Sequence, residues 1–200
     1  SGVMTSLPSI LVALLNSLLA TVSQTAIAFF GIYFKLQSFI YMPANGLIQG
    51  MRPLISYNYG ARHFDRVKKI IKVSIISTAV ILCCGTIIFM GLPELVLSWF
   101  NATEQLLEIG IIGLRVISPC FILSTMGVVI SGVFESLGKG RQSLTISLLR
   151  QFIITLPLAY ILLKVIGLNG IWLSFVIAEG IASVIAVILI KKELHNFKVD

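Results

Sequence analysis

The sequence predicts an all-α membrane protein with six transmembrane helices. Its 200 residues are 57% hydrophobic and 12% charged, and their mean hydropathy is +1.01. A soluble domain is about 25% charged, so a chain with so few charges cannot cover its own surface in water. Long apolar runs recur along the chain, and the loops between them alternate between basic and non-basic. These three observations together favour a multi-pass membrane protein.

A helix needs about 20 mainly apolar residues to cross the hydrocarbon core, and six runs meet that requirement. The second is interrupted by Pro43 and by the Asn45-Gly46 pair, where we expect a break in the helix. We treat residues 1–200 as one domain. The predicted spans are about 4–24, 27–51, 70–92, 106–137, 143–165 and 170–190.

A basic segment after the second span fixes the predicted orientation. Gly60 ends the helix, because glycine takes a left-handed C-terminal conformation without strain. Lys and Arg side chains stay on the cytoplasmic side of a membrane. The predicted topology anchor consists of Arg62, Arg66, Lys68 and Lys69.

The remaining loops agree with this orientation. The turn at 138–142 and the C-terminal tail are basic, whereas the connection expected outside holds Glu94, Glu104 and Glu108. We therefore predict that both termini are cytoplasmic and that the protein lies in the plasma membrane (the bacterial inner membrane), with the lipid bilayer as its partner.

Ionisable side chains at membrane depth are costly unless they are paired or hydrated, which makes them candidates for function. Glu179 lies about midway along the sixth span, and Lys35 lies slightly outward of the middle of the second. Both could face a polar cavity and bind a cation or substrate, or they could pair with each other or with backbone groups. Asn16 and Asn45 are further candidates for the substrate or ion pathway, although Asn16 could equally bond a neighbouring helix.

Three charged residues near the inner end of the fourth span suggest an ion pair or a cytoplasmic gate. Glu135 and Lys139 are four residues apart, the spacing of a helical ion pair. Arg150 or Arg141 could join them. Glu135, Lys139 and Arg150 therefore form the predicted cytoplasmic-end cluster.

The patterns typical of enzymes do not occur in the sequence. It has no cluster of His, Cys and acidic residues at metal-ligand spacing and no glycine-rich phosphate loop. The basic residues that give the net charge of +7 lie in loops between apolar runs, so topology explains them better than nucleic acid does. We predict no enzyme activity, no catalytic residue, no metal site, no cofactor and no nucleic-acid partner.

Four segments resemble the multidrug and toxic compound extrusion (MATE) transporters. Pro53-Leu-Ile-Ser-Tyr-Asn-Tyr-Gly-Ala and the basic loop after it are similar to the signature that follows their eighth span. Later segments resemble their tenth, eleventh and twelfth spans: Phe134-Glu-Ser-Leu-Gly-Lys-Gly-Arg-Gln, then Ser147-Leu-Leu-Arg-Gln with Leu156-Pro-Leu, then Gly167-Leu-Asn-Gly-Ile-Trp with Glu179. The resemblance implies the C-terminal six-helix lobe of a twelve-helix, two-lobe transporter. The N-terminal lobe of the same polypeptide is then its partner, absent from this chain, which opens on Ser1 rather than Met.

The resemblance also implies a function, the export of cationic or amphipathic drugs in exchange for sodium ions or protons. Some members carry cation-binding carboxylates in the seventh and tenth spans, but the matching spans here have no acid at mid-depth. Either Glu179 serves, or the coupling ion binds mainly in the missing lobe. Two alternatives stay open. A lipid-linked saccharide flippase should line its cleft with many basic residues, and a non-transporting scaffold would not need Lys35 and Glu179.

Overall fold

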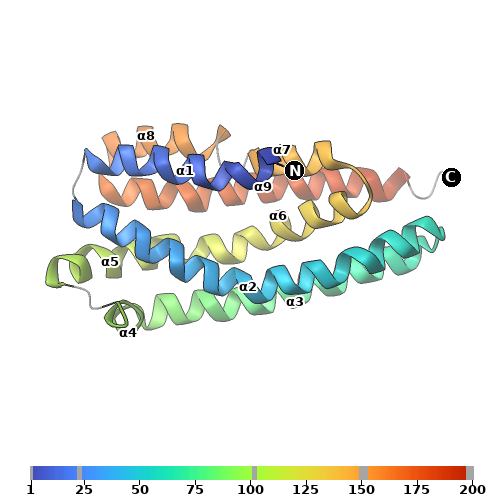
Figure 1. Cartoon of the computed structure of the whole chain (residues 1–200), viewed down its shortest axis with the longest axis horizontal. Helices are drawn as coiled ribbons and strands as arrows, with labels where there is room; N and C mark the ends of the chain where they lie inside the picture. The colour runs from blue at the N-terminus through green and yellow to red at the C-terminus, as the bar shows by residue number, and fades with distance from the viewer. Residues whose placement is uncertain (1, 22–23, 101–102, 149–152, 197–200) are drawn as a thin grey trace.

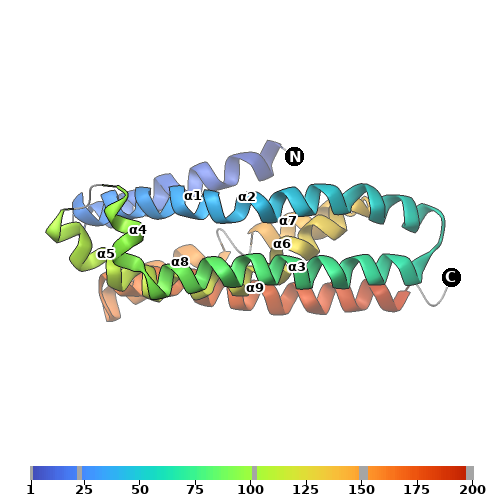
Figure 2. The same ribbon diagram turned by 90° about the horizontal axis from the view of Figure 1, so that it is seen from below.

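The chain folds into an elongated bundle of α-helices (Figures 1 and 2). The computed structural model describes residues 2–21, 24–100, 103–148 and 153–196, and within these ranges it contains no β-strand. The helices are α1 (Gly2–Ala20), α2 (Gln24–Gly60), α3 (Phe64–Gly91), α4 (Pro93–Ser98), α5 (Glu104–Ile117), α6 (Pro119–Ser136), α7 (Gly140–Leu148), α8 (Thr155–Val165) and α9 (Leu168–Asn196).

Helix α2 is longer than the sequence suggested. The break predicted at Pro43 does not occur, because one helix runs through both Pro43 and Pro53 and ends at Gly60. A proline inside a helix removes one backbone hydrogen bond, and neighbouring helices can compensate for that loss in a membrane protein. The turn that follows holds Arg62 with a φ of 61°. The predicted second span is therefore the first part of a 37-residue helix.

Two of the predicted spans are divided. The range 106–137 contains α5 and α6, which meet at Ser118, next to Pro119. Pro119 is tolerated there because the first turn of a helix needs no bond from its N–H. The carbonyl oxygen of Ser118 accepts a hydrogen bond from Thr86 Oγ1 of α3 at 3.3 Å. The range 143–165 contains the end of α7 and all of α8, with residues 149–152 between them outside the described residues.

By length and composition, four helices among the described residues could cross a membrane, namely α2, α3, α6 and α9. Helix α8 is apolar but shorter. The fold is therefore that of an all-helical membrane protein, while the count of six spans stays a prediction.

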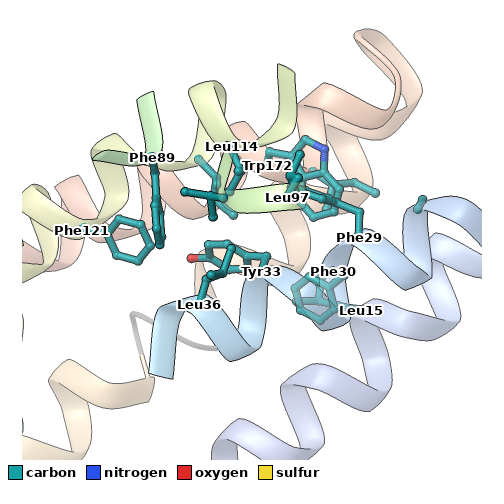
Figure 3. Close-up of a cluster of buried hydrophobic side chains, with 14 of the residues drawn as sticks. Leu15, Phe29, Phe30, Tyr33, Leu36, Phe89, Leu97, Leu114, Phe121 and Trp172 are labelled. Carbon is teal, nitrogen blue, oxygen red and sulfur yellow. The ribbon is translucent and has the colours of Figure 1, made fainter. Parts of the chain in front are cut away.

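Apolar side chains form two buried clusters at different levels of the bundle. One joins α1, α2, α5, α6 and α9 and includes Leu15, Phe29, Leu114, Phe121 and Trp172 (Figure 3). The other lies further along α2, α6 and α9, towards the turn between α2 and α3. Each cluster removes apolar surface from its surroundings and fixes one stretch of α2 against α6 and α9.

Charge is divided between the two ends of the bundle. The turn between α2 and α3, the turn between α6 and α7, and the end of α9 lie at one end (Figures 1 and 2). We call this the basic end, because Arg62, Arg66, Lys68, Lys69, Lys139, Arg141, Lys191 and Lys192 gather there. Helix α4 and the start of α5 lie at the opposite, acidic end, with Glu94 and Glu104 exposed. The positive-inside rule would place the basic end in the cytoplasm, and this orientation stays a prediction.

Helices α8 and α9 form a tight hairpin at the acidic end. Gly167 has a φ of 100°, and its N–H donates to the carbonyl oxygens of Leu162 and Leu163, which ends α8. A methyl group on Gly170 would lie against the backbone of Leu162, 2.6 Å from its carbonyl carbon. Backbone cannot move aside as a flexible side chain can, so Gly170 permits this close approach.

We therefore predict that Gly170→Ala lowers the free energy of unfolding by about 1–3 kcal/mol, the usual cost of overpacking. Thermal unfolding of the purified full-length protein in detergent would measure the change. Gly180→Ala on the same helix is the matched control, because its methyl group meets only Leu123 Cδ1 at 3.9 Å. Equal stability of the two variants would contradict the prediction.

Candidate functional site

A cavity of about 470 Å³ runs along one face of α2, between α2, α6 and α9. Most of the polar residues that α2 contributes to it recur every three or four residues, so they form a single stripe along the cavity. That stripe consists of Tyr33, Gln37, Tyr41, Asn45, Gln49 and Arg52. The other lining residues are Val12, Phe30, Phe34, Ser38, Ile48, Cys120, Val128, Ser131, Gly132, Glu135, Phe175 and Glu179.

Helix α6 forms the second wall and is held close to α2. The hydroxyl groups of Tyr41 and Ser124 are hydrogen-bonded at 2.6 Å. Nearer the basic end, a methyl group on Gly132 would lie 2.7 Å from Ile48 Cγ2, so only a glycine lets α2 approach α6 this closely. These two contacts hold the polar stripe of α2 in a fixed position relative to Ser131 and Glu135 of α6.

Aromatic rings line the part of the cavity nearer the acidic end. Phe30 stacks on Phe175 with ring centroids 6.1 Å apart and on Trp172 at the same distance. Trp172 also meets the edge of Phe29 at 5.0 Å (Figure 3). Because Trp172 is fully buried and packed on two sides, it fixes the ring of Phe30 at the cavity wall.

Glu179 lies one helical turn beyond Phe175 on α9 and lines this same aromatic part of the cavity. The residue is only 8% exposed. Tyr33 of α2, which is also buried, lines the cavity here too. A carboxylate beside aromatic faces provides both of the interactions that bind an organic cation, namely charge pairing and cation–π contact.

An ion pair lies at the basic end of the cavity. Arg52 Nη2 of α2 is 3.1 Å from Glu135 Oε2 of α6. Ser143 Oγ of α7 donates a hydrogen bond to Glu135 Oε1 at 3.0 Å. The hydroxyl groups of Ser143 and Ser131 are hydrogen-bonded to each other at 2.7 Å. The network therefore joins α2, α6 and α7.

The predicted pairing of Glu135 with Lys139 is wrong. Helix α6 ends at Ser136, and Gly138 turns the chain with a φ of 75°, so the two residues are not on one continuous helix. Lys139 Nζ instead lies 3.0 Å from Glu193 Oε1 on α9. Arg150, the third predicted member of that cluster, lies outside the described residues.

The other predicted site residues are spread over the bundle. Asn45 lines the cavity, whereas Lys35 is exposed on α2 and is not part of the lining. Asn16 is half-buried on α1, and its Oδ1 atom has no hydrogen-bond partner among the described residues. The topology anchor Arg62, Arg66, Lys68 and Lys69 lies at the basic end, where the guanidinium of Arg62 is 6.0 Å from the ring centroid of Phe64.

Sequence reasoning missed Arg52 and the glutamines of the cavity. The signal was present, since Tyr33, Gln37, Tyr41, Asn45 and Gln49 recur at every fourth residue and Arg52 follows three residues later. Among the described residues, no three His, Cys, Asp or Glu side chains lie close enough together to hold a metal ion.

A family model described as MatE matches residues 1–161. "Multidrug export protein MepA" of Staphylococcus haemolyticus (strain JCSC1435) is 31% identical over 186 residues, which is 92% of this chain and 40% of that protein. The protein of the same name from Staphylococcus aureus (strain MSSA476) is 30% identical over 93% of this chain and 41% of its own length. The chain thus spans about two fifths of the curated relatives that it matches.

Solved structures have the same fold. A structure described as "Outward-facing conformation of a multidrug resistance MATE family transporter of the MOP superfamily" aligns with a TM-score of 0.93 at 20% identity, over 99% of this chain and 45% of that one. A structure described as "Reverse polarity of binding pocket suggests different function of a MOP superfamily transporter from Pyrococcus furiosus Vc1 (DSM3638)" aligns with a TM-score of 0.92 at 21% identity, over 98% of this chain and 45% of that one. Since the family model covers most of the sequence, the chain belongs to the MatE family, that of the MATE transporters which its motifs resemble.

Proposed function

We propose that the chain is the C-terminal lobe of a multidrug exporter, and that its cavity binds a cationic amphipathic compound. Export would be driven by exchange for sodium ions or protons across the plasma membrane, with the N-terminal lobe of the same polypeptide completing the pathway. The names of the relatives support multidrug export. The observation that carries the proposal is the buried carboxylate of Glu179 beside the aromatic wall of Phe30, Tyr33 and Phe175.

The charge of the lining favours a cationic substrate. Among the described residues, two acids, Glu135 and Glu179, and one base, Arg52, line the cavity, which gives this part of the lining a net charge of −1 when all three are ionised. A site for a lipid-linked saccharide pyrophosphate would need an excess of basic groups. The lining therefore supports drug export over the flippase alternative.

The first test concerns Glu179. We expect Glu179→Gln in the full-length transporter to weaken binding of ethidium about tenfold or more, because it removes a buried charge-assisted contact. Fluorescence titration of the purified protein would measure affinity, and ethidium efflux from cells would report the matching loss of transport.

Lys35→Gln is the control for this test, since Lys35 is exposed and does not line the cavity. Its ethidium affinity should stay within about twofold of the parent, as expected for a surface substitution away from the site. If Glu179→Gln bound ethidium as the parent does, or if Lys35→Gln lost binding to the same extent, the assignment of the cavity would be wrong.

The second test separates drug binding from ion coupling. We propose that the coupling cation binds mainly in the N-terminal lobe. Glu179→Gln vesicles should therefore still respond to an imposed sodium or proton gradient at saturating drug. Transport would be compared with and without each gradient in vesicles that hold the full-length protein. If Glu179→Gln still bound drug but its transport did not respond to either gradient, the coupling site would be at Glu179 instead.

A further inference from the structure

The ion pair at the basic end of the cavity has a consequence for the charge of the substrate. We propose that Arg52 sets the number of positive charges that the cavity accepts. Because Arg52 already pairs with Glu135, a second positive charge on a substrate would have to compete with Arg52 for that acid, so the cavity favours monocations over long dications. This inference rests on the proposed function, because it assumes that the cavity binds cations.

Glu135 is engaged by the protein at both of its carboxylate oxygens. Arg52 is 3.1 Å from Oε2, and Ser143 donates to Oε1 at 3.0 Å. A cationic group of a substrate that reached Glu135 would have to displace the guanidinium of Arg52. That displacement would leave a half-buried guanidinium without its partner, and an uncompensated charge is costly.

The two acids are also far apart along the bundle. Ser183 Oγ of α9 donates to the carbonyl oxygen of Leu123 of α6, which sets the register of two helices that run in the same direction (Figure 1). Glu179 comes four residues before Ser183, and Glu135 comes twelve residues after Leu123. At a rise of 1.5 Å per residue, the two glutamates are separated by about 24 Å along the axis.

Because the two acids are this far apart, the preference of the cavity depends on the distance between a substrate's charged groups as well as on their number. Only a dication whose charged groups are about 20 Å apart could reach both acids, allowing for the length of the Glu side chains. A short dication would place its second charge among Gln37, Tyr41 and Asn45, which have no formal charge. Removing Arg52 should therefore favour long dications in particular.

The experiment measures equilibrium binding to the full-length transporter in detergent. Three probes are compared: a monoquaternary ammonium compound, a bis-quaternary compound with a short linker, and one whose linker spans about 20 Å. Displacement of bound ethidium gives each affinity, and the readout is the affinity of each dication divided by that of the monocation. The variants are Arg52→Gln, Glu135→Gln and the double variant Arg52→Gln/Glu135→Gln.

We expect Arg52→Gln to raise the ratio for the long dication about tenfold, the effect of one newly available charged contact. The ratio for the short dication should not rise. The double variant should return both ratios to the parent values, because it removes one base and one acid together and leaves the net charge of the lining unchanged. Glu135→Gln changes the charge in the opposite direction, so its long-dication ratio should fall below that of the parent, and this variant tests the proposal even if Arg52→Gln does not fold.

Lys139→Gln is the matched control, because it also removes a base from an ion pair at the basic end, but one that does not line the cavity. Its ratios should equal those of the parent. The proposal is overturned if Arg52→Gln leaves the long-dication ratio unchanged, if the short dication gains equally, or if Lys139→Gln gives the same rise. Failure of the parent to bind the monocation would instead refute the proposed function, and this inference with it.

Discussion

The structure depends on one constraint: inside a bilayer, polar groups have no water to bond, so the protein must satisfy them itself. The backbone meets this constraint by forming helices over nearly all of its described length. Side-chain hydroxyl groups satisfy nearby carbonyl groups: Thr86 Oγ1 donates hydrogen bonds to the carbonyl oxygens of Leu82 and Ser118, beside the break between α5 and α6. Most charged side chains meet it by lying near the two ends of the bundle or, like Arg52, Glu135 and Glu179, in the cavity along α2.

The long helix α2 shows how this constraint produces a binding site. Its apolar side chains, such as Phe29, Leu36 and Ile55, are buried, and the helix packs mainly against α3, α5 and α6. Its polar side chains recur every three to four residues and so share a separate face, which forms the cavity wall. Gly132 on α6 and the bond between Tyr41 and Ser124 hold this face close to its partner helix. The same contacts that stabilise the fold therefore position the functional groups.

Much of this architecture could be predicted from local patterns. Apolar runs predicted the helices, and the sign of the loop charges predicted which turns share an end of the bundle. Tertiary packing decided what local patterns could not, as when α2 continued through Pro43 and Glu135 paired with Arg52 rather than with Lys139. Helical spacing predicts which neighbours a side chain can reach within one helix, but the positive φ of Gly138 removed Lys139 from that helix. Glu179 could be named as a candidate site residue from its position in the span alone, because an acid at membrane depth is costly whichever helices pack around it.

Some of the polar side chains that line the cavity are also exposed on the outside of this chain. Asn45 and Gln49 of the polar stripe line the cavity and are nevertheless exposed in this chain, as is Ser38 nearby on α2. Phe39 and Met42 are exposed beside them. Amides that face hydrocarbon would each lose hydrogen bonds to water. They are stable there only if they face a water-filled cleft or another protein surface. Lys35, exposed on the same helix, meets the same cost, so its ammonium group also needs water or a polar surface outside this chain.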